Sequence, residues 1–460
     1  MDEAKSYFFC GIGGSGMLPL ALIVRGLGHR VAGSDRTLDQ GRLAPKFAFL
    51  RARGIDLFPQ DGSGIASPDQ IVVASAAIEE TVADMVRARE IGATRIARPE
   101  LLAELFNAAP LGIAVGGTSG KSTVTGMIGW ILHALGRDPT VMNGAVMKNF
   151  VSGEMPFASA LVGGDRVFVS EVDESDGSIA LYRPRVAVLN NVTLDHKSLD
   201  ELRHLFADFA AKAETVVVNL DDDETRFLAA VLPPERLRSY SVEDRAADLF
   251  GAELAEEPFA IAFEANGVPV RLRVPGRHNA ANALAALAAC EALGIPLADA
   301  AEALGGFAGL GRRFELAGSA NGIAVIDDFA HNPDKIAATL RTLHAFPGRL
   351  LLFFQPHGYG PLKTMKDALI ASFAASMAAE DVLIMPDPVY YGGTTSREVG
   401  SGDIIAGVVD HGRLAEHVAD RADAGDRLAA LARPGDRIVV MGARDDTLSL
   451  FAREILEKLG

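Results

Sequence analysis

A glycine-rich stretch in the first third of the chain carries residue types that suit phosphate binding. Residues 116–123 read Gly-Gly-Thr-Ser-Gly-Lys-Ser-Thr, after the hydrophobic run 111–115 and before the amphipathic segment 124–135. Small residues let backbone N–H groups converge on a phosphate, and the start of a helix adds roughly half a positive charge. The spacing predicts that Lys121 reaches the outer phosphates of a nucleotide and that the Ser122 hydroxyl faces Mg²⁺.

The general pattern of such loops is met only in part. Val115 stands where the pattern has its first glycine, so the glycines begin closer to the lysine. An ordinary glycine turn between a strand and a helix is the alternative, but Gly-Lys-Ser-Thr at such a junction favours phosphate binding. The residues expected to hold ATP here are Gly117, Thr118, Ser119, Gly120, Lys121, Ser122 and Thr123.

Two further hydrophobic runs end in side chains that suit a metal ion. The run 167–172 leads into the acids Glu171, Asp173, Glu174 and Asp176. The run 185–191 is followed by Asp195 and His196. Carboxylates at the carboxyl end of a strand, in a chain with a phosphate loop, are candidate Mg²⁺ ligands. A solvated acidic loop and a purely structural histidine are the alternatives.

A second glycine-rich motif lies near the N-terminus. The strand expected over 6–10 leads into Gly11-Ile12-Gly13-Gly14-Ser15-Gly16, and Asp35 follows at the spacing of about 20 residues at which a carboxylate meets a ribose hydroxyl. NAD is the first interpretation, but the same loop can hold any diphosphate. Ser75 ends another expected strand, 71–75, and is small enough to border a ligand.

Polar residues farther along the chain also follow expected element boundaries. Asn279 and Asn282 are three apart at the start of an alanine-rich helix, so both can face the same side, although plain capping by Asn279 is the alternative. After the segment that contains Arg312-Arg313, a new series of alternating strand and helix patterns begins. The expected strand 323–326 is followed by the segment Asp327-Asp328-Phe329-Ala330-His331-Asn332-Pro333.

The elements that must position these residues alternate between hydrophobic strands and helices. This rhythm predicts an α/β fold of three domains. We expect a Rossmann-like domain over 1–107, a central P-loop ATPase-like domain over 108–315, and a C-terminal Rossmann-like α/β domain over 316–460.

Composition narrows the class of protein. The chain has 460 residues, 49% of them hydrophobic, and a net charge of −16, and it lacks a basic run, so nucleic acid is not an expected partner. Its two cysteines, Cys10 and Cys290, lie far apart and are expected to be reduced thiols of a cytoplasmic protein. We find neither a signal-peptide pattern nor an apolar stretch of about 18 residues, so membrane insertion is not expected.

Taken together, these motifs resemble the Mur ligase family, ATP-dependent enzymes that add amino acids to the UDP-N-acetylmuramic acid precursor of peptidoglycan. The resemblance covers nearly the whole chain and rests on six motifs in family order. They are 117–123 (GTSGKST), 171–176 (EVDESD), 190–196 (NNVTLDH), 276–282 (GRHNAAN), 311–315 (GRRFE) and 327–333 (DDFAHNP). Folylpolyglutamate synthetases share some of these motifs but lack this kind of N-terminal domain.

The resemblance implies an amide-bond ligase that joins the carboxylate of UDP-N-acetylmuramate to an amino acid through an acyl phosphate. It implies ATP and two Mg²⁺ ions as cofactors, and a monomer or homodimer. The implied catalytic residues are Lys121, Glu171, His196 and His331, with Ser122, Glu171 and His196 as metal ligands. Asn279 and Asn282 would meet adenine, and Arg313 and Asp327 the triphosphate side and ribose, with Arg312 competing with Arg313. The implied substrate-binding residues are Gly11, Gly13, Gly14, Ser15, Gly16, Asp35, Ser75 and His357, with UDP in place of NAD.

The incoming amine stays open within the family. The N-terminal motif resembles the L-alanine ligase branch, which includes the recycling ligase that attaches a ready-made tripeptide. Within that branch, 182–185 and 190–191 look closer to the recycling enzyme, whereas 171–176 look closer to the alanine ligase. The alanine branch has an arginine directly after Gln-Pro-His, but here Gly358 and Gly360 follow His357. Lys363 or Lys366 is a candidate replacement for the cation, and a different or larger amine is the alternative. A nicotinamide-dependent oxidoreductase and a non-catalytic Mur-like nucleotide-binding protein are the rival interpretations.

Overall fold

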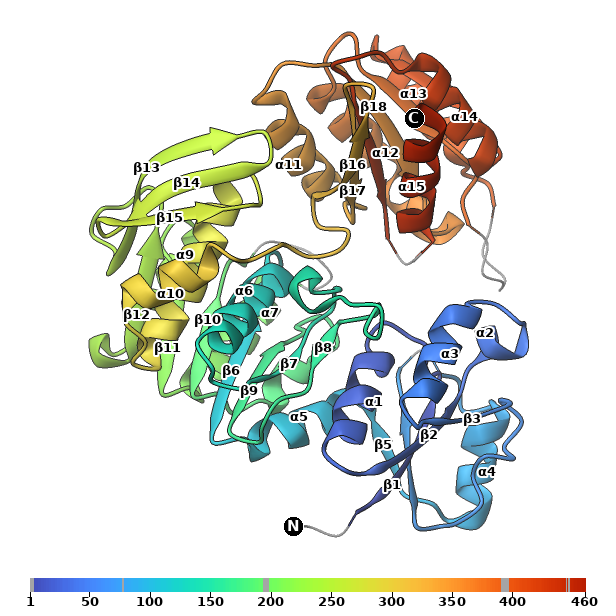
Figure 1. Ribbon diagram of the computed structural model, residues 1–460, viewed down its shortest axis with the longest axis vertical. Helices are drawn as coiled ribbons and strands as arrows, with labels where there is room; N and C mark the ends of the chain where they lie inside the picture. The colour runs from blue at the N-terminus through green and yellow to red at the C-terminus, as the bar shows by residue number, and fades with distance from the viewer. Residues whose placement is uncertain (1–3, 77, 193–197, 390–396, 444, 446) are drawn as a thin grey trace. The chain divides into compact units, whose positions relative to one another are not determined.

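The structure is a computed structural model that describes residues 4–76, 78–192, 198–389, 397–443, 445 and 447–460 (Figure 1). The chain forms two compact units. The first consists of Met1–Glu256, Ile261–Arg273 and Arg277–Leu310, and the second of Glu257–Ala260, Val274–Gly276 and Gly311–Gly460. Two sheets lie in the first unit and one in the second. The predicted α/β fold with three sheet-containing domains is confirmed, whereas the predicted domain boundaries stay a prediction.

The first sheet of unit 1 is parallel, with five strands in the described part of the chain in the order β3-β2-β1-β4-β5. The strands are β1 Ser6–Cys10, β2 Arg30–Ser34, β3 Asp56–Phe58, β4 Gln70–Ala74 and β5 Arg95–Ala97. The helices are α1 Met17–Gly26, α2 Arg36–Asp39, α3 Ala44–Ala52, α4 Ala83–Ile91 and α5 Arg98–Ala108. β1 is buried almost throughout, as expected for a central parallel strand covered on both faces.

The second sheet of unit 1 has the order β15-β14-β13-β12-β11-β10-β6-β9-β7-β8, counted over the described residues. Its strands are β6 Leu111–Gly116, β7 Thr140–Met142, β8 Ala160–Leu161, β9 Val167–Glu171, β10 Val186–Leu189, β11 Thr215–Asn219, β12 Leu237–Ser241, β13 Leu249–Glu257, β14 Ala260–Ala265 and β15 Val268–Leu272. The helices are α6 Lys121–Ala134, α7 Leu199–Ala211, α8 Asp223–Val231, α9 Arg277–Ala292 and α10 Leu297–Leu304.

The order of this second sheet explains why distant motifs meet. β6 lies between β10 and β9, and it pairs with both in parallel, with Gly116 beside Leu189 and Val115 beside Glu171. The segments that follow these three strands therefore begin at the same edge of the sheet. Ligands of open α/β sheets bind at the carboxyl ends of strands. The phosphate loop, the acids from Glu171 onward and Asn190 all start from that edge.

The sheet of unit 2 has the order β16-β17-β21-β18-β19-β20 in the described residues, with β16 antiparallel to β17 and the other pairs parallel. The strands are β16 Glu315–Ala320, β17 Ile323–Asp328, β18 Leu350–Gln355, β19 Val382–Met385, β20 Leu414–His417 and β21 Arg437–Gly442. The helices are α11 Pro333–His344, α12 Tyr359–Ser376, α13 Ser401–Asp410, α14 Arg421–Leu431 and α15 Leu448–Leu459.

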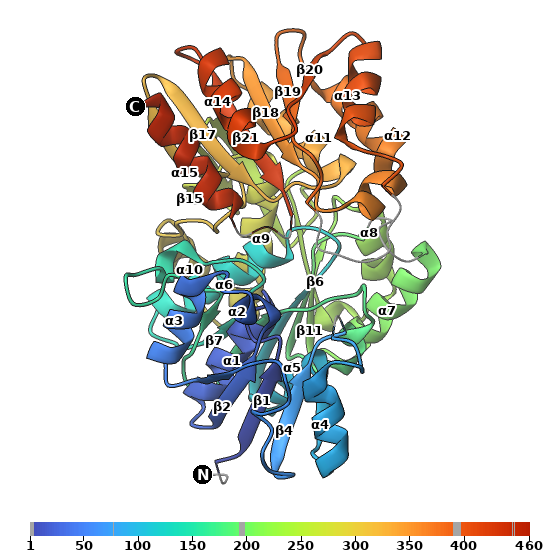
Figure 2. The same ribbon diagram turned by 90° about the vertical axis from the view of Figure 1, so that its right-hand side faces the viewer.

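Helices cover both faces of the unit 2 sheet (Figure 2). Alternate residues of β18 divide between two clusters, because successive side chains of a strand point to opposite faces. Leu352 packs in the cluster that contains residues of α11, α12 and α13, whereas Phe353 packs in the cluster with α14 and α15. The result is a three-layer α/β unit whose core supports the loops after β17, β18 and β21.

Candidate active site

The phosphate loop joins β6 to α6 and requires glycine at two points. Gly117 and Gly120 have φ of +122° and +82°, a region that residues with a Cβ seldom adopt. A Cβ on Gly117 would lie 3.0 Å from the Asn191 carbonyl oxygen, and one on Gly120 would lie 2.6 Å from Asn282 Oδ1. The loop is therefore packed closely against neighbouring segments, with α6 beginning at Lys121.

Asn191 fixes the first half of the loop. Its Oδ1 accepts hydrogen bonds from Thr118 Oγ1 and from the Ser119 backbone N–H, both at 2.8 Å. Its backbone carbonyl accepts a third from the Thr118 N–H at 3.1 Å. We did not predict this role for Asn191. The available signal was its place directly after β10, the strand beside β6.

The acidic segment, residues 171–176, supplies carboxylates to both reactive side chains of the loop. Ser122 Oγ donates to Glu171 Oε2 at 2.6 Å. Lys121 Nζ donates to Glu174 Oε2 at 2.8 Å and to the Gly117 carbonyl at 2.7 Å. The structure thus brings together Lys121, Ser122 and Glu171, and it gives Glu174, also predicted as a candidate Mg²⁺ ligand, to the lysine as a partner.

Ser122 and Glu171 fit the predicted Mg²⁺ site. A hydroxyl and a carboxylate are the hard oxygen donors that this cation takes, and it commonly completes its shell with water and substrate phosphates. Within the described ranges there is no group of three or more His, Cys, Asp or Glu side chains that could hold a metal by themselves. His196, the third predicted ligand, lies outside the described residues, so its role stays a prediction.

Asn279 and Asn282 face each other, as their spacing predicted. Asn282 Nδ2 donates to Asn279 Oδ1 at 3.1 Å. The alternative of plain capping by Asn279 is wrong, because α9 already begins at Arg277. Buried Asn190 joins this pair to the loop through long hydrogen bonds from its Nδ2 to Ser119 O (3.4 Å) and Asn282 Oδ1 (3.5 Å). Their contact with adenine remains a proposal.

The N-terminal glycine motif is held by the aspartate predicted to meet a ribose. Asp35 Oδ2 accepts from the Gly13 N–H at 2.8 Å, and its Oδ1 accepts from the Thr37 N–H at 2.8 Å at the start of α2. Lys46, which the sequence analysis missed, donates to the Gly13 carbonyl at 3.2 Å. Cys10 pairs with Ala74 between β1 and β4, so Gly11 and Ser75 follow their strands at one edge. Ligand contacts of this loop stay predictions.

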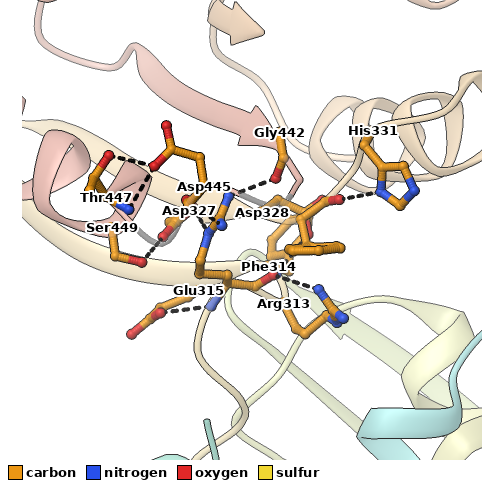
Figure 3. Close-up of polar contacts among 12 residues, drawn as sticks. Arg313, Phe314, Glu315, Asp327, Asp328, His331, Gly442, Asp445, Thr447 and Ser449 are labelled. Atoms are coloured by element: carbon orange, nitrogen blue, oxygen red, sulfur yellow. Dashed lines mark hydrogen bonds and ion pairs between the residues drawn. The ribbon is translucent and has the colours of Figure 1, made fainter. Parts of the chain in front are cut away.

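In unit 2, the two adjacent arginines, Arg312 and Arg313, have different hydrogen-bond partners. Figure 3 shows Arg313 together with Asp327 and Gly442. The Arg312 guanidinium is buried and donates to Asp327 Oδ1 (3.3 Å), the Gly442 carbonyl (2.6 Å) and the Asp445 carbonyl (2.8 Å). The Arg313 guanidinium lies 4.3 Å from the centre of the Phe329 ring, which Arg312 also approaches, at 5.2 Å, and it donates to the Arg312 carbonyl at 3.3 Å. Arg312 is thus committed to holding the fold, which leaves Arg313 as the better candidate for a phosphate.

Asp327 is buried, and both of its carboxylate oxygens accept hydrogen bonds. Its Oδ1 accepts from Arg312, and its Oδ2 accepts from Ser449 Oγ at 2.7 Å. Burial raises the pKa of the Asp327 carboxyl, and the Arg312 guanidinium opposes that rise. The predicted contact between Asp327 and the nucleotide is untested and remains a proposal.

His331 is held in a defined orientation beside Arg313 and His357. Its Nδ1 lies 2.9 Å from the Phe329 carbonyl, which can only accept, so Nδ1 carries the proton and Nε2 presents a lone pair. The His331 and His357 rings meet edge to face, with centroids 5.7 Å apart. Burial, followed by the charge of Lys335, lowers the pKa of His331 from 6.5 to about 4. The ring is therefore neutral near pH 7.

This lowered pKa predicts a pH dependence of stability. The unfolded chain takes up a proton near pH 6.5 and the folded chain only near pH 4, so the stabilisation is complete above pH 6.5 and is lost as the pH falls to 4. We expect about 1–2 kcal/mol after allowance for partial exposure of the ring. Thermal unfolding from pH 7.5 to 4 should therefore lower the melting temperature of the wild type a few degrees more than that of His331→Gln. Parallel curves for the two proteins would contradict this assignment.

The region that departs from the alanine branch lies at the start of α12. Gly358 has φ of +144° and precedes the first helical residue, Tyr359. Lys363, a candidate replacement for the missing cation, forms an exposed ion pair with Glu398 at 2.7 Å. The Arg397 guanidinium lies 5.7 Å from the Tyr359 ring centre. Among the described residues, a cation therefore does stand near the start of α12, although it comes from another part of the chain.

Comparison with known proteins places these features in one family. Three family models match successive parts of the chain: "Mur ligase family, catalytic domain" over residues 6–109, "Mur ligase middle domain" over 115–290, and "Mur ligase, glutamate ligase domain" over 312–444. A UDP-N-acetylmuramate–L-alanine ligase from Geobacter sp. (strain M21) is 35% identical over 438 residues, which cover 89% of this chain and 90% of that protein. The chain belongs to the Mur ligase family.

Further relatives and solved structures support the same family membership. A UDP-N-acetylmuramate–L-alanine ligase from Sulfurihydrogenibium sp. is 33% identical over 88% of this chain and 87% of its own length. The crystal structure of UDP-N-acetylmuramate-alanine ligase from Thermotoga maritima has a TM-score of 0.79 and 26% identity, covering 98% of each chain. A murein peptide ligase from Psychrobacter arcticus, at 24% identity and a TM-score of 0.70, shares the fold over 99% of each chain. In the described part of this Mur ligase, none of the helices is both long and apolar enough to cross a membrane.

Proposed function

We propose that this Mur ligase uses ATP to join the lactyl carboxylate of UDP-N-acetylmuramate to the amino group of L-alanine, a step in the synthesis of the peptidoglycan precursor. The observation that carries the proposal is the phosphate loop with Lys121 and Ser122 facing the acidic segment. The alanine specificity is supported by relatives named UDP-N-acetylmuramate–L-alanine ligase at 33–35% identity. ATP, Mg²⁺ and the UDP-sugar are the proposed ligands.

The chemistry requires two anions to meet. The sugar carboxylate attacks the γ-phosphorus of ATP, the bond from that phosphorus to the β,γ-bridging oxygen breaks, and ADP leaves. The amine then attacks the acyl phosphate carbon, phosphate leaves, and the amine loses a proton. A like-charge pair at 4 Å costs about 4 kcal/mol at an effective dielectric constant near 20. Lys121 and the backbone N–H groups at the start of α6 would offset this cost and hold the phosphate in line.

Other residues of the site are proposed to support this reaction. Mg²⁺, when bound at Ser122 and Glu171, would neutralise phosphate charge. The neutral His331, with its Nε2 lone pair, can accept a hydrogen bond from an N–H or O–H group of a ligand. We propose that the N-terminal glycine loop holds the diphosphate of UDP and not NAD, because relatives over most of the chain are named UDP-N-acetylmuramate–L-alanine ligase.

Attachment of a tripeptide is the second candidate function, because of Gly358. The absence of a side chain there leaves space at the start of α12, since among the described residues a Cβ would meet Pro361 Cδ alone, at 3.7 Å. A solved structure from Neisseria with 26% identity and a TM-score of 0.56 is titled UDP-N-acetylmuramate:L-alanyl-γ-D-glutamyl-meso-diaminopimelate ligase, and it covers 66% of this chain. This makes the choice of amine a matter for experiment.

The test is a screen of amines with UDP-N-acetylmuramate and Mg-ATP. Phosphate release and product mass are measured for L-alanine, glycine, L-serine and the tripeptide. We expect release to require both the sugar nucleotide and an amine, with the highest kcat/KM for L-alanine. A higher kcat/KM for the tripeptide would replace the proposal by the recycling function. Nucleotide binding without any product would favour a non-catalytic Mur-like protein.

A further inference from the structure

Glu174 is a buried carboxylate whose contact with the phosphate loop has no place in the mechanism so far. Its side chain is only 6% exposed, and its Oε2 accepts from Lys121 Nζ at 2.8 Å. Lys121 belongs to the helix that follows the loop, whereas Glu174 follows β9, so the pair links two segments of the sheet edge. This buried contact restricts the position of the Lys121 ammonium group.

The geometry leaves Lys121 able to bind phosphate without leaving Glu174. An ammonium group has three N–H donors. One points to the Gly117 carbonyl at 2.7 Å and one to Glu174, which leaves a third for a phosphate oxygen. If the lysine moved away, it would leave a carboxylate buried without this partner, an arrangement that is strongly unfavourable. Retention of the pair during ATP binding is therefore the more stable outcome.

The neighbouring acids of the segment have other partners. Asp173 Oδ1 accepts from the Ser175 N–H and hydroxyl, and Asp176 Oδ1 accepts from the Ser178 N–H. Glu171 is committed to Ser122. Of the four acids in the segment, Glu174 is thus the one that accepts a hydrogen bond from the lysine of the loop.

We propose that Glu174 is a positioning residue that holds Lys121 over the phosphate loop while the lysine binds the outermost phosphate of ATP. This inference rests on one part of the proposed function, namely that the phosphate loop binds ATP. Because Lys121 reaches the outer phosphates, loss of the Glu174 charge should affect a triphosphate far more than a diphosphate. That difference separates positioning from a merely structural role.

The experiment measures calorimetric binding of Mg-AMP-PNP and Mg-ADP to the full chain. In Glu174→Gln, which keeps the shape and an acceptor oxygen, we expect the Kd for AMP-PNP to rise about tenfold and the Kd for ADP to change less than twofold. Glu174→Asp, which keeps the charge but withdraws it by one methylene, should weaken AMP-PNP binding less. Asp208→Asn is the matched control, because it removes a carboxylate from the exposed ion pair with Lys212 on α7.

A double-variant cycle tests whether Glu174 acts through the lysine. Adding Glu174→Gln to Lys121→Met should cause no further loss of AMP-PNP affinity, because the group being positioned is already gone. Tighter AMP-PNP binding by Glu174→Gln would overturn the proposal and make Glu174 a competitor of phosphate. Equal losses for AMP-PNP and ADP, or a further loss in the double variant, would also overturn it. These readouts use nucleotide alone, so a failed amine screen would reject the proposed function without touching this inference.

Discussion

Replacement of Lys121 by alanine is expected to lower the kcat for ATP-dependent phosphate release by about 10²–10³-fold. The ammonium group is held at 2.7 Å from the Gly117 carbonyl and 2.8 Å from Glu174, at the start of α6. Alanine removes the cation that would stabilise charge on the transferring phosphoryl group. Phosphate release with saturating UDP-N-acetylmuramate and L-alanine is the measurement.

Two control measurements test whether the loss of activity is due to the Lys121 side chain. Lys212→Ala, which removes a lysine from an exposed ion pair on α7, should leave kcat within twofold of the wild type. Lys121→Ala also leaves Glu174 without its lysine, so the melting temperature is measured beside the activity. Turnover of Lys121→Ala at the wild-type rate would remove Lys121 from the catalytic machinery.

Arg312→Ala is expected to destabilise unit 2 by about 3–5 kcal/mol, the cost of breaking a buried ion pair by removal of one partner. The Arg312 guanidinium is the donor to one carboxylate oxygen of Asp327 and to two backbone carbonyls that follow or end β21. Its loss leaves Asp327, which is 1% exposed, with an uncompensated charge. Differential scanning calorimetry, in which the two units can unfold separately, measures the change.

Arg313→Ala is the matched comparison, one residue along the chain. Its guanidinium lies over the Phe329 ring and donates to the Arg312 carbonyl at 3.3 Å. We expect its loss to cost less than about 1 kcal/mol of stability. If Arg313 meets the triphosphate as proposed, the KM for ATP should rise about tenfold. A large stability loss in Arg313→Ala, with Arg312→Ala unaffected, would reverse the two assignments.

The sequence alone was enough to predict the fold class and the position of the main site. Hydrophobic runs of four to six residues predict buried parallel strands because both faces of such a sheet are covered. Chemistry-bearing residues directly after those runs must then gather at the carboxyl edge. Lys121, Ser122 and Glu171 were predicted on this basis, and the contact between Ser122 and Glu171 agrees with it. Six motifs in order indicated the Mur ligase family, which the relatives confirm.

What the sequence could not decide were choices between chemically similar neighbours. Arg312 and Arg313 are identical in type, but Arg312 adopts φ of +57° and turns its guanidinium inward to Asp327 and β21. Three acids follow β9, yet only the folded sheet edge places Glu174, rather than Asp173, on Lys121. Asn191 became a loop-holding residue because β10 lies beside β6.

Residue type and spacing along the chain thus determined that this protein has a phosphate loop, an acidic segment and three α/β domains in family order. Tertiary structure decided which member of each set is buried and which partner it meets. The physical reason is that hydrogen bonds and ion pairs act over about 3 Å in space, whereas partners such as Lys121 and Glu174, or Arg312 and Gly442, are 53 and 130 residues apart in sequence. The order of the strands brings such partners together: β6 lies between β10 and β9 in unit 1, and β17 lies beside β21 in unit 2.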